Sequence, residues 1–450
     1  MIRKVQLRIK TNSFARALLM TLIFPLSVFA QDSKSDSLLR NATLENVVSY
    51  AISHQPLIQQ SIVDQDITNA MIKTKLADWY PQINFNYNLT HNFELQPNVI
   101  PGVGVVRLGL VNTSLGQFAA TQNLFNRDIF LASRTASEVR LQALQKTSSN
   151  KIDIAVNVTK AFYDVLSTAQ QIKLGKGDII RLNQSLKTAH DQYDAGIVDK
   201  TDYKRAQIAL NNTDATLKRN GELLRYKIEN LKAYMGYPPN GTLDVVYDTL
   251  QMENEIPLDT LQLLDYQQRI DYKLLTTQQK LQDYNLKYAK WSFLPVIALQ
   301  GAYNFYYFNN DFEKVYSNQY SYSNAAVTLT VPLFQGGKRI ENIKIQRYTV
   351  RRLNLDMTRL LNNSTAEYAQ ALAAYKGNLV TYLSLKENVD LAKEVYDIIQ
   401  LQYKTGIKTY LEVITAETDL RNARTNYFNS LYQVLASKID VQKALGQINY

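Results

Sequence analysis

The chain has 450 residues with 50 Lys and Arg, 40 Asp and Glu, 3 His and no Cys, and its formal net charge is +10. The lack of cysteine excludes disulfides, thiol nucleophiles, cysteine-ligated metals and an acylated N-terminal cysteine. The three histidines, His54, His91 and His190, lack the i,i+4 spacing of a metal site. We therefore expect no enzymatic activity, no metal and no other cofactor.

Residues 1–30 have the pattern of an export signal peptide. Five cationic residues lie within the first 16 positions and precede an apolar run, Ala17–Phe29, which closes on the cleavage site Val28-Phe29-Ala30. The run is short for a membrane span of ~20 residues, although a single membrane anchor is the alternative. Removing the five cations lowers the formal charge from +10 to +5, which indicates a mixed solvated surface and not a nucleic-acid footprint.

The segment 31–81 is predicted to contain N-terminal helices. Thr43 is a candidate N-cap for a helix whose apolar residues recur at helical spacing from Leu44. Pro56 can open a second helix, which we expect to end near Trp79, before Pro81.

The segment 82–120 is predicted to be a pair of strands. In residues 82–90 every odd position is apolar and every even position is polar, which is typical of a strand. A weaker strand is expected around Val105 to Ala120, after a turn-prone stretch.

The segment 121–239 is predicted to be a helical hairpin. Helical sequence resumes near Asn126, runs past Gly175 and Gly177 to Tyr193, and continues after Gly196 to Met235. A continuous helix over 127–194 would be on the order of 100 Å long. The sequence Gly236-Tyr237-Pro238-Pro239 is a strong helix stop.

The second half repeats this order. A linker and helix are expected over 240–294, with the helix from 259 to Trp291, then a strand pair over 295–334 and a second helical hairpin over 335–450. Aromatic residues of this strand pair are typical of a girdle at a membrane surface, or alternatively of an adhesive strand pair: Tyr303, Phe305, Tyr306, Tyr307, Phe308, Tyr316, Tyr320 and Tyr322.

A constant offset supports an internal duplication. At +210, Tyr193 falls on Tyr403, Gly196 on Gly406 and Gly236 on Gly446, while Pro81 and Pro295 match at +214. Such an offset is the signature of a repeat and is not produced by similar composition alone.

The strands indicate how the chain meets a membrane. No stretch after residue 30 has 18 consecutive apolar residues, so no membrane-spanning helix is predicted. Four strands cannot close a barrel, but two copies would give a filled eight-stranded barrel and three copies a twelve-stranded barrel with a passage. We predict an α+β membrane protein in which long antiparallel helices form a coiled-coil barrel and four β-strands per chain form a shared 12-stranded transmembrane β-barrel in a trimer.

Three motifs carry a family resemblance. They are the strand entries Leu76–Pro81 and Trp291–Pro295, the strand exit Val331–Gly337, and a Tyr-x-x-Gly turn followed by an acid six positions after the glycine. With the duplicated layout they resemble the TolC family of bacterial outer-membrane efflux proteins over residues 42–450. Two departures are a first strand exit without the Pro and Gly pair, and Thr415 where a second acid is frequent.

The resemblance implies a function and partners. We expect a homotrimer in the bacterial outer membrane, with its helices in the periplasm, that serves as the exit duct of a tripartite efflux pump or type I secretion system. Its implied partners are a periplasmic adaptor, or membrane fusion protein, and an inner-membrane pump of RND, ABC or MFS type. Substrate would pass passively, and the sequence does not identify it.

Seven residues are candidate site residues. Gly196 and Gly406 are placed where long helices reverse, at the expected periplasmic tip. Asp202 and Glu412 follow these turns and would form a ring of six carboxylates in a trimer, or would simply stabilise two helix N-termini. The resemblance implies that Thr201, Tyr403 and Lys408 latch the tip helices in a closed state.

Two other functional classes stay open at this point. A secreted structural or adhesive protein with a coiled-coil stalk should have uninterrupted heptads, whereas this chain turns back at Gly196 and Gly406. A soluble basic nucleic-acid-binding protein is disfavoured by the export signal and the modest charge.

Overall fold

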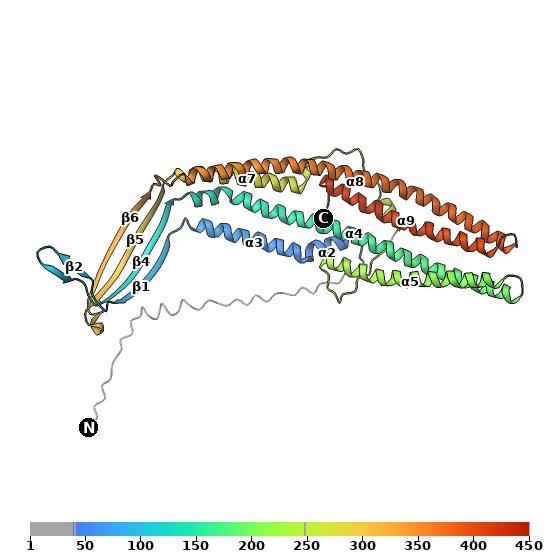
Figure 1. The fold of residues 1–450 in the computed structure, drawn as a ribbon, viewed down its shortest axis with the longest axis horizontal. Helices are drawn as coiled ribbons and strands as arrows, with labels where there is room; N and C mark the ends of the chain where they lie inside the picture. The colour runs from blue at the N-terminus through green and yellow to red at the C-terminus, as the bar shows by residue number, and fades with distance from the viewer. Residues whose placement is uncertain (1–38, 40–41, 247–248, 450) are drawn as a thin grey trace, which may run out of the picture. The chain divides into compact units, whose positions relative to one another are not determined.

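The computed structural model describes Leu39 and residues 42–246 and 249–449 (Figure 1). The predicted signal peptide, residues 1–30, lies outside the described residues. In chain order the larger elements are α2 (Leu44–His54), α3 (Pro56–Ala77), β1 (Gln82–His91), β2 (Pro97–Ile100), β3 (Gly104–Arg107), β4 (Asn112–Phe125), α4 (Arg127–Asp194), α5 (Lys200–Met235), α6 (Thr249–Asn254), α7 (Ile270–Lys290), β5 (Val296–Asn309), β6 (Gln319–Thr330), α8 (Lys338–Lys404) and α9 (Tyr410–Leu445).

The longer strands form one antiparallel sheet in the order β1-β4-β5-β6 (Figure 1). The register places Phe85 opposite Phe118, Phe118 opposite Tyr303 and Tyr303 opposite Ser323. Strands β1 and β6 are the two edges of this sheet. The first and second strand pairs of the sequence therefore join into a single sheet through the β4–β5 pairing.

The two faces of the sheet differ in chemistry. Side chains that share one face are largely apolar and include Ile83, Phe85, Phe118, Tyr303, Phe305, Val327 and Leu329. The opposite face carries an amide row, in which Asn86 donates to Gln117 at 3.4 Å and Gln117 donates to Asn304 at 2.8 Å. This division follows from the alternation of side chains along a strand.

The second strand of the first pair differs from the prediction. The residues around Val105 belong to a separate hairpin of β2 and β3, and β4 begins only at Asn112 and continues to Phe125. Gly104 and Gly109 take positive φ values of 98° and 135°, which interrupt an extended strand. Strand β4 also has small residues, such as Gly116 and Ala120, on its apolar face, so its alternation is weak in the sequence.

Helices α4 and α8 each pack against the helix that follows them, forming hairpin 1 (α4 and α5) and hairpin 2 (α8 and α9). Helix α4 runs for 68 residues without a break at Gly175 or Gly177. Helix α3 packs on α4, and α7 packs between α4 and α8. None of the helices within the described residues combines the length and apolar character needed to cross a membrane.

The main hydrophobic core lies where α2, α4, α5, α8 and α9 meet. It contains the fully buried residues Val47, Val158, Leu231, Leu431 and Val434. Helix α6 and the residues that follow it contribute Met252 and Ile256 to this core. There Glu253 binds Lys386 of α8 at 2.7 Å, and Glu255 accepts a hydrogen bond of 2.5 Å from Tyr163 of α4. This segment therefore ties the two hairpins together at the core.

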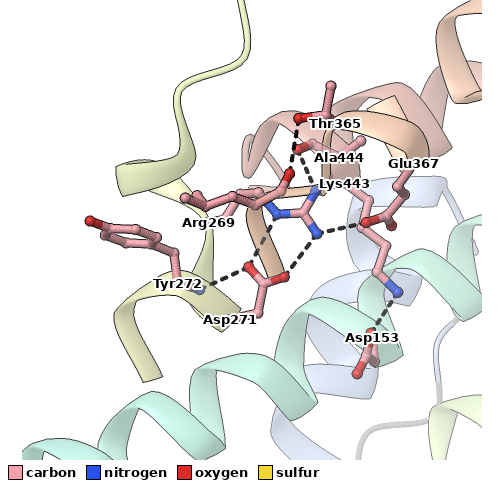
Figure 2. A network of polar contacts seen from close by, with 9 residues as sticks. Asp153, Arg269, Asp271, Tyr272, Thr365, Glu367, Lys443 and Ala444 are labelled. Carbon is pink, nitrogen blue, oxygen red and sulfur yellow. Dashed lines mark hydrogen bonds and ion pairs between the residues drawn. The ribbon is translucent and has the colours of Figure 1, made fainter. Parts of the chain in front are cut away.

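Helix α7 starts later than predicted. The helix expected from residue 259 begins at Ile270, because Arg269 is extended, with φ −69° and ψ 136°. The Arg269 side chain is buried and donates to Ala444 O at 2.8 Å, to Glu367 at 2.7 Å and to Asp271 at 2.9 Å (Figure 2). The extended residue thus brings a cation to the carboxyl end of α9, where the helix dipole favours it.

The same contact recurs in the first repeat with different chemistry. Gln55 stands 214 positions before Arg269, and its amide donates to Ala233 O and Tyr234 O at the end of α5, both at 3.2 Å. Gly236 and Gly446 end these helices with φ values of 66° and 74°. The repeat is therefore visible in the packing, with a neutral amide in one half and a guanidinium in the other.

Candidate functional site

The candidate site is formed by the two turns between paired helices, residues 195–199 and 405–409, which we call the tip turns. Gly196 and Gly406 take φ values of 72° and 77°. In each turn the residue after the glycine donates to the carbonyl four positions before the glycine, with Ile197 N to Gln192 O and Ile407 N to Gln402 O both at 2.9 Å. The sequence folds this way because glycine has no Cβ to oppose a left-handed helix end.

The helix after the first tip turn is capped by Asp199. The carboxylate of Asp199 accepts hydrogen bonds from the Thr201 amide at 2.7 Å and from the Thr201 hydroxyl. These bonds hold the pKa of Asp199 below its usual range. The predicted latch residue Thr201 therefore has a partner within its own turn.

The helix after the second tip turn begins with a capping box of Thr409 and Glu412. Lys408 Nζ also lies 2.6 Å from Glu412 Oε1. Lys408, then Thr409, lower the pKa of Glu412 to about 2. The stabilisation that this carboxylate gives to the turn is present above the ordinary pKa of 4.5 and is lost as the pH falls toward 2.

Asp202, the other predicted carboxylate, has a different environment. Its side chain is partly exposed, and within the part of the chain that the structure describes it makes neither a hydrogen bond nor an ion pair. Asp202 lies in the first turn of α5, where the helix dipole favours an acidic residue. The two predicted carboxylates are therefore unequal, because Lys408 balances the charge of Glu412, whereas Asp202 has no ion pair with any residue that the structure describes.

Tyr403 joins the two hairpins near the tip turns. Its hydroxyl donates to Gln192 Oε1 of α4 at 2.5 Å, and its ring lies 5.7 Å from that of Tyr410. Burial, with a smaller contribution from Asp202, raises the pKa of Tyr403. Tyr410 packs in turn with Ala189 of α4 and Ala206 of α5.

The structure thus separates the three predicted latch residues by partner. Tyr403 bridges hairpins, whereas Lys408 and Thr201 bond within their own turns. The sequence reasoning did not identify Gln192 as the partner of Tyr403, nor the buried Tyr410. Gln192 and Gln402 are related by the +210 offset, and this relation is the sequence signal that could mark Gln192 as a residue of the tip turns.

Across the described ranges, no three His, Cys, Asp or Glu residues are grouped in a way that could hold a metal ion.

Comparison with known proteins identifies the family. The model of the outer membrane efflux protein family matches residues 47–237 and 274–447, which is most of the chain. Outer membrane protein TolC of Vibrio cholerae is 21% identical over 446 residues, covering 95% of this chain and 96% of that protein. TolC of Escherichia coli is 20% identical over 447 residues, covering 95% of this chain and 87% of that protein.

The fold agrees with this match. The crystal structure of the outer membrane protein VceC from Vibrio cholerae superposes with a TM-score of 0.71 at 13% identity, covering 90% of this chain and 96% of that chain. At this identity the likeness shows a shared fold and nothing more specific. Together with the family match over both halves of the repeat, it leads to one conclusion. This chain belongs to the outer membrane efflux protein family.

Proposed function

We propose that the chain assembles as a homotrimer whose strands close a 12-stranded barrel in the outer membrane and whose helical hairpins form a duct in the periplasm. The observation that carries this proposal is the four-stranded sheet with two unpaired edges. Strands β1 and β6 have 10 and 12 residues, and each has a neighbour on one side only. Inside a bilayer, unpaired backbone groups at both edges are costly, and pairing β6 of one copy with β1 of the next satisfies them.

The side chains favour the same arrangement. The apolar face suits contact with lipid, and the face with the Asn86, Gln117 and Asn304 amide row suits an aqueous lumen. All residues of β6 are exposed in the single chain, as is expected of an edge that a second copy covers. Twelve strands leave room for a passage, which eight do not.

The two faces of β6 provide a test. Val327→Lys places a charge on the apolar face and should reduce the heat-resistant trimer in outer-membrane extracts, at a cost of about 2 kcal/mol per chain. Thr328→Lys, one position along on the other face, is the matched control and should assemble normally. The measurement is the trimer band on gels of unheated and heated membranes. Equal loss in both variants, or in neither, would contradict the assignment of the faces.

The partners follow from family membership and remain part of the proposal. The periplasmic end of the helical duct would meet an adaptor, the membrane fusion protein, and through it an inner-membrane pump of RND, ABC or MFS type. Energy would come from the pump, while the chain would provide a passive route for efflux or type I secretion. The family match favours this function over the adhesive and nucleic-acid-binding alternatives.

We further propose that the tip turns form the narrow end of the duct, where the charges of Asp202 select cations. Single-channel recordings should show that Asp202→Asn lowers cation selectivity more than Glu412→Gln, because Lys408 already balances the charge of Glu412 at 2.6 Å.

The same recordings test the proposed latch of the closed state. Tyr403→Phe removes the hydrogen bond to Gln192 and should raise the resting conductance. Unchanged selectivity in Asp202→Asn would refute the carboxylate ring, and unchanged resting conductance in Tyr403→Phe would refute the latch.

A further inference from the structure

Charged side chains meet where α9 of hairpin 2 packs on α4 of hairpin 1, around Asp178, Arg181 and Glu417, a contact that we call the inter-hairpin seam. The two carboxylates are buried, whereas the Arg181 side chain is 38% exposed. Asp178 and Glu417 are each 4% exposed. Arg181 donates to the Asp178 carboxylate, and its Nε lies 3.8 Å from Glu417 Oε1. One guanidinium therefore serves two buried carboxylates.

Glu417 is the less well satisfied of the two carboxylates. Its Oε1 atom is buried and accepts no hydrogen bond, and 3.8 Å is too long for one. A buried carboxylate oxygen without a donor loses its hydration and gains nothing in return. Burial raises the pKa of Glu417, with Asp178 adding to the shift and Arg181 opposing it. The ionised form is thus the poorly accommodated form in this packing.

The remaining groups that face Glu417 do not supply the missing donor. Tyr396 of α8 and Tyr410 of α9 are buried tyrosines whose pKa values are raised, by burial first and then by Glu417. Arg421 of α9 favours ionisation of Glu417, but its guanidinium is bonded to Thr213 of α5 at 2.8 Å. The seam as packed therefore favours a proton on Glu417.

We propose that Glu417 is a positioning residue for the tip turns: protonated, it holds α9 against α4, and ionised, it drives the hairpins apart, so that passage opens as the pH rises. Glu417 follows the second tip turn by about two turns of α9. In the same helix pair Tyr410 of α9 packs with Ala189 of α4. Tyr403, at the end of α8, bonds to Gln192 of α4 and packs on Tyr410. Loosening the seam therefore loosens the contacts that hold the tip turns together.

The direction of the pH effect follows from the linkage between helix packing and proton binding by Glu417. Separation of the helices hydrates the carboxylate and returns its proton affinity to the ordinary value, so the packed form binds the proton more tightly than the separated form. Protonation of Glu417 stabilises the packed form fully below the ordinary pKa of glutamate. This stabilisation is lost as the pH rises through the raised pKa that Glu417 has in the packed form. This inference rests on the proposed duct, because it assigns a way of regulating it.

The test uses the full chain in planar lipid bilayers between pH 5 and pH 8. The open fraction of the wild type should rise with pH, whereas Glu417→Gln should stay near the low-pH level throughout. Asp178→Asn removes the competing carboxylate and lowers the pKa of Glu417 in the packed form, so the rise of the open fraction should be smaller than in the wild type and should end at lower pH. Asp419→Asn, an exposed acid on the same helix, is the matched control and should follow the wild type.

A second measurement separates this inference from the duct itself. Hydrogen exchange of the backbone amides of residues 410–424, corrected for the intrinsic pH effect, should accelerate with pH in the wild type and not in Glu417→Gln. A pH profile of Glu417→Gln that matches the wild type in both measurements would overturn the inference. Absence of current in every form, the wild type included, would contradict the duct, while the exchange data would still decide the role of Glu417.

Discussion

Replacing Gly236 by alanine is expected to destabilise the chain by about 3 kcal/mol, which combines about 1 to 2 kcal/mol for a left-handed backbone with a further cost for overpacking. Gly236 has φ 66°, and a Cβ there would lie 2.8 Å from Pro56 Cδ and 2.9 Å from both Gln55 Cα and His54 O. Two of these three neighbours are backbone atoms, which cannot move aside as the end of a flexible side chain can. The loss should appear as a fall of several degrees in the melting temperature, followed by helical circular dichroism in detergent.

Gly196→Ala is the matched control for this prediction. Gly196 has φ 72°, but none of the described residues lies within 4 Å of a Cβ at that position. The control therefore carries only the backbone cost of about 1 to 2 kcal/mol. Equal melting temperatures for the two variants would show that the α5 end does not pack against the start of α3 as described.

Replacing Arg269 by alanine is expected to cost about 3 kcal/mol, the range for removing one partner of a buried charged network. The substitution leaves Ala444 O without its donor and leaves Asp271 and Glu367 without their shared cation (Figure 2). The two carboxylates are partly exposed, with side chains 38% and 46% accessible, so water replaces part of the lost interaction. Thermal unfolding in detergent measures the effect, and exchange should increase at the last turn of α9.

The first repeat provides the control for Arg269. Gln55→Ala removes two neutral hydrogen bonds of 3.2 Å at the end of α5, and also the bond of 3.1 Å that Gln55 accepts from Leu57 N as the N-cap of α3. Because all three bonds are neutral and exposed, the loss should be about 1 kcal/mol. Arg269→Lys keeps the charge but loses the forked donor geometry, so it should fall between the wild type and Arg269→Ala. An Arg269→Ala variant as stable as Gln55→Ala would contradict the stronger anchoring of the second repeat.

Much of the fold could be predicted from local signals. Thr43 caps α2 and Pro56 opens α3, as their residue types require. The alternation in residues 82–90 coincides with β1, and Pro295 immediately precedes β5. In each of these cases the deciding interaction is made by residues close in sequence, so the local pattern is sufficient.

The remaining boundaries depend on contacts between distant segments. Leu261 and Leu263 lie within the helix predicted from residue 259, but they are 86% and 87% exposed in an irregular segment. The start of α7 is set instead by Arg269, which reaches the end of α9. The burial of Glu417 likewise depends on α4, more than 200 positions away in the chain, and a carboxylate within a helical stripe gives no local sign of it.

The two tip turns of one chain have the same backbone conformation but different helix caps. Asp199 binds Thr201 in the first turn. In the second turn Thr409 and Glu412 form a capping box, and Lys408 pairs with Glu412. In a threefold assembly six hairpins would alternate around the rim, so its outline would be nearly sixfold while its chemistry would be only threefold. Six identical partner molecules that bound to this rim would then meet two kinds of binding site. Three of them would bind at one kind of tip turn and three at the other.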